Sequence, residues 1–419
     1  MTPPRNPPTD PPTKDFMRSS FLVAAVVAIS VSALPAHAQG RGGGRGTAIN
    51  IPAGEQCPAG MTEIRPRQCM PPEFPAPSIV DYRPKSTLVA PVHMKPTPKY
   101  PAIDYHGHAA GRLGSAEGIE SLGAALDTIG VRLFVAADNM SGENLKKSLA
   151  LVSASPKMKD RIRILAGISF RDVGPGWAEK AVAQLDADIA AGAVGVGEIS
   201  KGLGLSARKS DGSRLQIDDP MLDPVWQEAA KLNIPVFIHT ADPASFFKPI
   251  DYTNERWLEL ALFGDRRYPA DKFPSFEQLM TERDNMVRRN PKTTFVIAHM
   301  SWYANDLGKL AKLMDEYPNV VTEMGAVLYD IGRQPRVAHD FFIKYQDRIL
   351  FGKDSFQPEE YPYYWRVFET RDDYFDYYRD YHAFWKLYGI DLPDEVLKKI
   401  YYKNALRITS KLPGQGWPK

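Results

Sequence analysis

The chain has 419 residues, of which 43% are hydrophobic and 24% are charged, and this composition is ordinary for a globular protein with a large core. The formal net charge is only +2, and no basic block stands in the body of the chain. The chain therefore lacks the electrostatic footprint of a nucleic-acid-binding protein, and we expect a small-molecule substrate.

The N-terminus has the features of a secretory signal peptide, predicted over residues 1–38. A positive charge follows Met17, the run Phe21–Leu34 is apolar but short, and Ala36-His37-Ala38 is a cleavage site of small residues. The proline-rich residues before Met17 suggest that this methionine is the true start. We expect a mature periplasmic or secreted chain that begins near Gln39 and has no stable membrane span; the alternative is an uncleaved anchor.

Residues 39–100 are rich in glycine and proline, which excludes a regular helix or a central strand. We predict a flexible start followed by an extended arm that lies on the main domain. Cys57 and Cys69 stand close together in this arm, without a zinc-ligand pattern around them. In an exported chain they are expected to form a disulfide; the alternative is two free thiols.

From Ala102 onward, short apolar runs alternate with helix-like stretches, which predicts a (β/α)₈ TIM barrel over residues 101–412. The helical pattern at 178–191 ends at Gly192, the pattern at 223–232 ends shortly before Pro235, and the pattern at 307–317 ends at Pro318. A doubly wound open sheet is the alternative, but its Gly-rich first turn is missing. The predicted strands are 103–108, 131–135, 162–168, 193–199, the runs that end at His239 and His299, 320–323 and 349–352.

Four further segments surround the predicted barrel. The long connections 203–220 and 241–276 leave the carboxyl ends of strands, where barrel active sites are built, so we expect them to wall the substrate pocket. The aromatic stretch 361–385 is predicted to pack over the barrel or to form an interface in a homodimer; the alternative is that it lines the pocket. Residues 397–409 are predicted to form a closing helix.

Five polar residues stand where predicted strands end: His106, His108, His239, His299 and Asp354. Successive side chains on a strand point to opposite faces, so His106 and His108 point the same way. All strand ends of a barrel meet at one mouth, so the five side chains should converge there. A single histidine at a strand end is often only hydrogen-bonded, but the set predicts one divalent cation, Zn²⁺ first, with Mn²⁺ and Fe²⁺ as alternatives.

These motifs resemble the amidohydrolase superfamily, most closely its amidohydrolase 2 branch, over about residues 101–410. The resemblance implies that His106, His108, His239 and Asp354 are metal ligands and that His299 is the catalytic histidine. As a carboxylate at the mouth, Asp354 is also expected to shuttle a proton. The matching segments are Asp104-Tyr105-His106-Gly107-His108, Pro235 to Pro243, Phe295 to Met300, and Ile349 to Ser355.

Four residues near the predicted mouth have open roles. Lys353 stands where the family more often has Ser or Thr, and it either contacts an acidic substrate or points away. Glu198, on the fourth strand, is a second-metal ligand, a substrate contact, or a buried acid paired with Lys201. Arg171, just past the third strand, is a pocket candidate.

The leading functional expectation is a secreted metal-dependent hydrolase that cleaves a C–N or C–O bond of a small molecule with metal-activated water. The alternative is a non-oxidative decarboxylase of a carboxylated cyclic compound that uses the same ligands. A non-catalytic binding barrel is the third hypothesis. It would be marked by a missing ligand, and no ligand is missing from the pattern.

Overall fold

The computed structural model describes residues 47–75 and 77–418 and divides into two compact units, one ending at Ser78 and one beginning at Ile79. The predicted signal peptide lies outside the described residues. Among the described residues, no helix combines the length and apolar character that crossing a bilayer requires.

The first unit contains a small antiparallel sheet of β1 (Ile49–Asn50), β2 (Thr62–Arg65) and β3 (Gln68–Met70), with β3 in the middle. A disulfide joins Cys57 to Cys69, which is buried on β3. This part of the predicted arm is thus more regular than expected: a short hairpin with a turn at 66–67 lets β3 pair on both edges.

The second unit is built on a sheet of parallel strands that runs, by neighbour, β11-β10-β9-β8-β7-β6-β5-β4-β12. The strands are buried along almost their whole length, as expected of strands covered on both faces. Their bounds are β4 (Ala102–His108), β5 (Val131–Met140), β6 (Ile162–Ala166), β7 (Val196–Ile199), β8 (Val236–Ile238), β9 (Phe295–Ile297), β10 (Val320–Glu323), β11 (Ile349–Leu350) and β12 (Asp354–Ser355).

The two ends of this sheet, β11 and β12, are two halves of one strand, separated by residues 351–353. β11 pairs with β10, whereas β12 pairs with β4 in the register Asp354 to Gly107. Between them, the Tyr105 N–H donates to the Phe351 carbonyl at 3.0 Å. The eighth strand therefore links the seventh strand to the first, and the sheet closes into the predicted TIM barrel.

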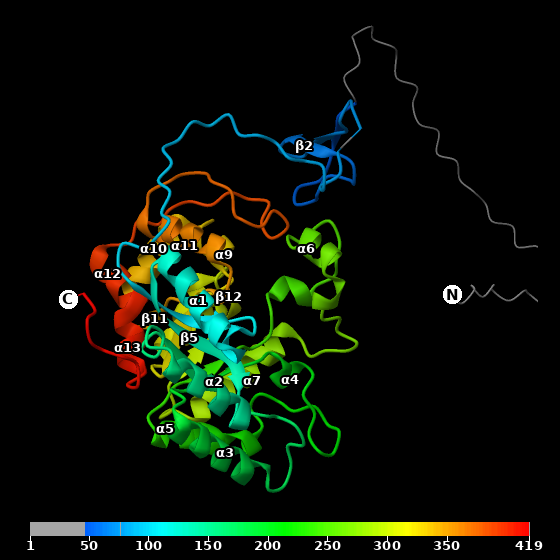
Figure 1. Ribbon diagram of the computed structural model, residues 1–419. Helices are drawn as coiled ribbons and strands as arrows, with labels where there is room; N and C mark the ends of the chain where they lie inside the picture. The colour runs from blue at the N-terminus through cyan, green and yellow to red at the C-terminus, as the bar shows by residue number, and fades with distance from the viewer. Residues whose placement is uncertain (1–46, 76, 419) are drawn as a thin grey trace, which may run out of the picture. The chain divides into compact units, whose positions relative to one another are not determined.

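Helices cover the outside of the barrel between successive strands (Figure 1). Their ends follow capping rules: the Ser115 side chain accepts the Gly118 N–H at the start of α1, which ends at Gly130 with φ +71°. The helices are α1 (Ala116–Ile129), α2 (Gly142–Ala154), α3 (Trp177–Ala191), α4 (Gly202–Leu205), α5 (Asp223–Lys231), α6 (Trp257–Leu262), α7 (Phe276–Arg289), α8 (Leu307–Glu316), α9 (Leu328–Ile331), α10 (Pro335–Lys344), α11 (Tyr361–Glu369), α12 (Asp394–Lys398) and α13 (Asn404–Ile408).

Residues 79–100 form the extended part of the arm, without helix or strand. Ionic contacts hold it to the segment that begins at α11. The His93 backbone N–H and Nδ1 both reach Asp372, at 2.8 and 2.5 Å. The Lys95 ammonium lies 3.8 Å from Glu369 Oε2, and the Lys99 backbone N–H donates to Glu369 Oε1 at 2.8 Å. Residues 79–100 therefore rest against the region around α11.

Candidate metal centre

His106 and His108 come from the carboxyl end of β4 and face one another across a short gap. Their Nε2 atoms are 3.2 Å apart. Gly107 lies between them, and a Cβ there would stand 2.1 Å from the ring of Phe134 on β5, so a side chain at this position would push the strand away. The strand thus presents two imidazole nitrogens to a single point.

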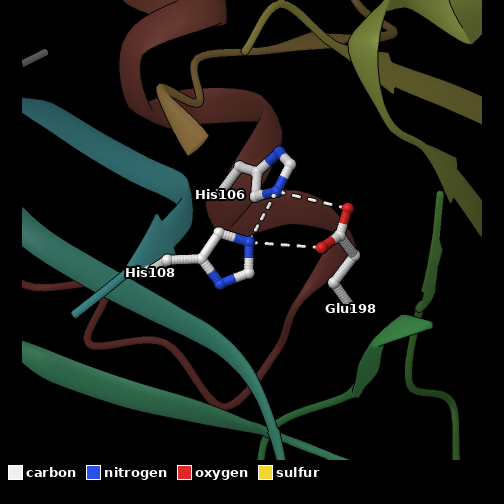
Figure 2. A group of neighbouring side chains, drawn as sticks. All are labelled: His106, His108 and Glu198. Carbon is white, nitrogen blue, oxygen red and sulfur yellow. Dashed lines mark hydrogen bonds and ion pairs between the residues drawn. The ribbon is translucent and has the colours of Figure 1, made fainter. Parts of the chain in front are cut away.

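Glu198, at the end of β7, brings a carboxylate to the same point (Figure 2). Its Oε1 lies 3.4 Å from His106 Nε2, and its Oε2 lies 3.2 Å from His108 Nε2. Sequence reasoning left the role of Glu198 open, with pairing to Lys201 as one alternative. In the structure, Lys201 Nζ instead binds Asp242 Oδ2 at 2.5 Å, and Glu198 faces the histidines.

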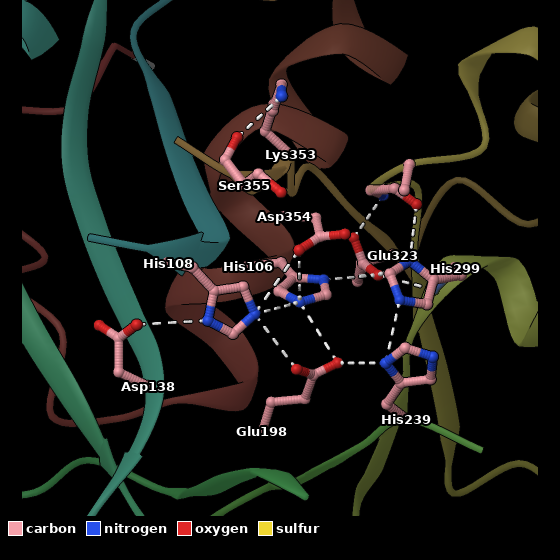
Figure 3. Close-up of polar contacts among 12 residues, drawn as sticks. His106, His108, Asp138, Glu198, His239, His299, Glu323, Lys353, Asp354 and Ser355 are labelled. Carbon is pink, nitrogen blue, oxygen red and sulfur yellow. Dashed lines mark hydrogen bonds and ion pairs between the residues drawn. The ribbon is translucent and has the colours of Figure 1, made fainter. Parts of the chain in front are cut away.

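Asp354 and His239 complete the cluster (Figure 3). Asp354 Oδ1 is 3.6 Å from His108 Nε2 and 3.9 Å from His106 Nε2. His239, directly after β8, turns its Nδ1 to Glu198 Oε1 at 2.9 Å. The side chains of His108 and Asp354 are about 30% exposed, at 31% and 28%, so the cluster is open to small molecules on this side.

His299 follows β9 in a turn whose four residues, His299 to Trp302, all have positive φ between 49° and 58°. This left-handed backbone is unfavourable for side chains other than glycine. It directs His299 Nδ1 to the Gly325 carbonyl at 2.8 Å and His299 Nε2 to His239 Nδ1 at 3.3 Å. The Nδ1–H donates to that carbonyl, so Nε2 presents a lone pair to the cluster.

Two carboxylates that sequence reasoning did not assign hold the first two histidines. Glu323, fully buried at the end of β10, accepts from His106 Nδ1 at 3.1 Å and from the His299 backbone N–H at 2.6 Å. Asp138, on β5, accepts from His108 Nδ1 at 3.3 Å. With each Nδ1–H donated to a carboxylate, both Nε2 atoms are free to bind a metal, and the ring orientations are set. Both acids stand near strand ends, which is the signal that could have found them.

Neighbouring charges and burial shift the pKa values of the cluster histidines in opposite directions. Burial opposes a charge on His106, but Glu198 and Glu323 outweigh it and raise its pKa well above the ordinary value. Burial likewise opposes a charge on His239, yet Glu198 raises its pKa to about 9. Burial lowers the pKa of His299 to about 4. Positive charge near Glu198 is therefore strongly stabilised. A divalent cation bound there would supply such a charge.

The donor set fits such a cation. A metal with bonds of about 2.1 Å holds neighbouring ligand atoms about 3.0–3.4 Å apart, close to the separations of 3.2, 3.4 and 3.2 Å among His106, His108 and Glu198. Glu198 Oε1 is buried and lies close to His239 Nδ1 and His106 Nε2, yet it accepts no hydrogen bond of good direction among the described residues, as expected of an atom that binds an ion. A second group of close donors is formed by Glu198, His239 and His299.

The other predicted site residues lie around the cluster or away from it. Lys353 is buried and turns away, because its Nζ binds Glu360 and the Ser355 carbonyl. Lys201 lies at the mouth and donates to Asp242. Asp242 Oδ1 in turn lies 3.7 Å from His239 Nε2. Arg171 is exposed in the segment after β6. Of this group, only Lys201 is linked to the cluster, through Asp242.

Weak structural likenesses accompany this geometry. They include a TIM-barrel protein from Bordetella bronchiseptica (TM-score 0.46, 16% identity, 74% of this chain and 99% of that one). Dihydroxybenzoic acid decarboxylase from Polaromonas sp. JS666, solved with manganese and 2-nitroresorcinol, has a TM-score of 0.45 at 13% identity, over 74% and 96% of the two chains. 4-Oxalomesaconate hydratase from Rhodopseudomonas palustris has a TM-score of 0.44 at 14% identity, over 74% and 96%. These values are too low to carry an argument about activity.

No curated protein shows significant similarity to the chain. The amidohydrolase family model, in contrast, matches residues 155–408, more than half of the 419 residues. The match includes β7 to β12, and therefore Glu198, His239, His299 and Asp354. On this match, the chain belongs to the amidohydrolase family.

Proposed function

We propose that the chain is a metal-dependent hydrolase that cleaves a C–N or C–O bond of a small molecule, and that it works outside the cytoplasm after loss of residues 1–38. The observation that carries the proposal is a convergence of five side chains beside the His299 imidazole, whose Nε2 presents a lone pair. The five are His106, His108, Glu198, His239 and Asp354. One divalent cation, Zn²⁺ first, fits these donors; when bound, such a cation lowers the pKa of water to about 7 and polarises a carbonyl.

The chain's own residues supply proton transfer and orientation. His299 Nε2 can accept a proton, because its Nδ1–H is already donated to the Gly325 carbonyl. Asp354, whose side chain is partly exposed at the mouth, can hold a proton between the cluster and a leaving group. Glu323 and Asp138 keep the rings of His106 and His108 in place during these transfers.

Hydrolysis is favoured over decarboxylation by the hydrogen bonding of His299. Protonation of a ring carbon before CO₂ loss would have to come from another group, such as Asp354, because His299 Nε2 offers an acceptor at the cluster. Activation of a nucleophile for hydrolysis requires an acceptor of this kind.

The experiment compares the protein loaded with Zn²⁺ or Mn²⁺ against lactones, esters and amides by proton release, and against hydroxybenzoates by CO₂ release. We expect bond hydrolysis and no CO₂. CO₂ release without hydrolysis would replace this proposal with the decarboxylase.

Four variants then assign the roles: His106→Ala, His239→Ala, Asp354→Asn and His299→Asn. The first three should lose metal as well as activity. His299→Asn should keep its metal while turnover falls by about 10²–10⁴, the range for loss of an acid/base group. Loss of metal from His299→Asn would instead make His299 a ligand, in a two-metal centre that shares Glu198. Metal retention in all four would refute the metal centre.

A further inference from the structure

A separate cavity of about 240 Å³ lies among the loops that follow β8, β9 and β10. Its lining includes Lys248, Arg256, Trp302, Asn305 and Asp330, and none of the metal-centre residues. It is smaller than the roughly 300–1,000 Å³ that drug-sized ligands occupy, so it suits a small molecule of a few heavy atoms.

Trp302 stands between this cavity and the metal centre. Its ring lies 4.4 Å from the His299 ring and 5.7 Å from the His239 ring, measured between centroids. Its Nε1–H donates to the Ala241 carbonyl at 3.1 Å, which holds the indole in place. A ligand in the cavity would therefore contact Trp302 and not the metal donors.

Asp330, on α9, is a carboxylate that lacks sufficient partners. It is only 7% exposed, and in the described part of the chain its buried Oδ1 accepts no hydrogen bond. Arg333 Nη2 comes within 2.6 Å of Oδ1, but without hydrogen-bond direction, and the same guanidinium donates to Glu255. Burial raises the pKa of Asp330 to about 6. A buried carboxylate in this state gains from a ligand that donates a hydrogen bond.

Lys248 supplies the opposite charge to the same cavity. It is exposed, and within residues 47–75 and 77–418 its ammonium has no ion pair or hydrogen bond. The second cation of the lining, Arg256, is already paired with Glu259 through Nε at 2.9 Å and through Nη2. The cavity thus offers a buried carboxylate whose ion-pair partner, Arg333, is shared with Glu255, and an exposed ammonium that has no partner among the described residues.

We propose that this cavity is a second binding site, distinct from the metal centre, for a small carboxylic acid that also carries an ammonium or hydroxyl group. Its carboxylate pairs with Lys248, and its donor group binds Asp330. Amino acids and hydroxy acids share this chemistry.

The test is calorimetric titration of the full-length, metal-loaded protein with L-serine and with lactate, beside propionate and ethanolamine, which carry only one of the two groups. We expect saturable binding of serine, lactate or both, and binding at least tenfold weaker for the other two. Asp330→Asn and Lys248→Ala should each weaken binding at least tenfold. Lys157→Ala, which removes an exposed lysine before β6, is the matched control and should bind normally.

Metal content separates this proposal from the proposed function, because none of these variants touches a metal donor, and all should keep wild-type metal. The absence of saturable binding to the wild type, equal binding of propionate and ethanolamine, or unchanged binding in Lys248→Ala would overturn the proposal. Should Asp330→Asn fail to fold, Lys248→Ala decides alone.

Discussion

Glu323→Gln is the sharpest test of how the metal centre is held. Glu323 is fully buried, and its two oxygens accept three hydrogen bonds: Oε1 from the His299 backbone N–H and His106 Nδ1, and Oε2 from the Gly325 backbone N–H at 2.5 Å. Glutamine has the same shape but only one accepting atom. Whichever way the amide turns, its NH₂ faces at least one buried N–H.

The expected loss in the free energy of unfolding follows from these hydrogen bonds. A buried donor left without an acceptor costs about 1–3 kcal/mol, and hydrogen bonds to a charged group are worth about 1.5–3 kcal/mol. We therefore expect Glu323→Gln to destabilise the protein by roughly 2–4 kcal/mol. Because the His106 ring also loses the group that orients it, metal affinity should fall about 10–100-fold, the usual effect of removing a partner behind a metal ligand.

The assay is metal competition against a chromophoric chelator, together with thermal unfolding. Thr322→Val is the matched control, because Thr322 is the neighbouring buried residue of β10 and its hydroxyl donates only to the Ile297 carbonyl at 2.8 Å. It should cost about 1 kcal/mol of stability and leave metal affinity unchanged. Wild-type metal affinity in Glu323→Gln, or an equal loss in Thr322→Val, would refute the reasoning.

Three further predictions concern other parts of the chain. N-terminal sequencing of exported protein should begin within a few residues of Gln39; an intact hydrophobic segment in the soluble mature protein would contradict cleavage. Mass spectrometry without reductant should find Cys57 linked to Cys69, and Cys57→Ser should destabilise the first unit by about 2–3 kcal/mol; two alkylatable thiols would exclude the bond. Burial lowers the pKa of His382 to about 4, so the folded state resists its protonation; stability should fall between pH 6.5 and pH 4, and less in His382→Gln, as melting curves would show.

The barrel was predictable because its strands are short apolar runs that end at turn residues. The run from Thr294 to His299, for example, contains β9 and stops where the chain turns. Strand parity alone put His106 and His108 on one face, and closure of the barrel put Asp354 beside them, paired through the register of β12 with β4. These are local signals combined with one topological rule, and both can be read from the residues.

The partners behind the ligands were not predictable in the same way. Glu323 was visible only as the last residue of a strand, and its three donors come from β4 and from the segments after β9 and β10. The left-handed turn at His299 to Trp302 contains no glycine that would have predicted it from the sequence. The break in the eighth strand at 351–353 depends on close packing, since a Cβ on Gly352 would lie 2.6 Å from Glu323 Oε2 and 2.7 Å from the His106 Cβ.

These unfavourable local features meet at one place, and this has a physical reason. Each non-glycine residue in the left-handed region costs about 1–2 kcal/mol, and four stand in succession at His299 to Trp302. The turn persists because Glu323 holds the His299 N–H and the Ala241 carbonyl holds the indole of Trp302. A shorter or relaxed turn would move the His299 imidazole away from His239. Strained backbone of this kind clusters at functional sites, and here it gives His299 its position beside the proposed metal donors.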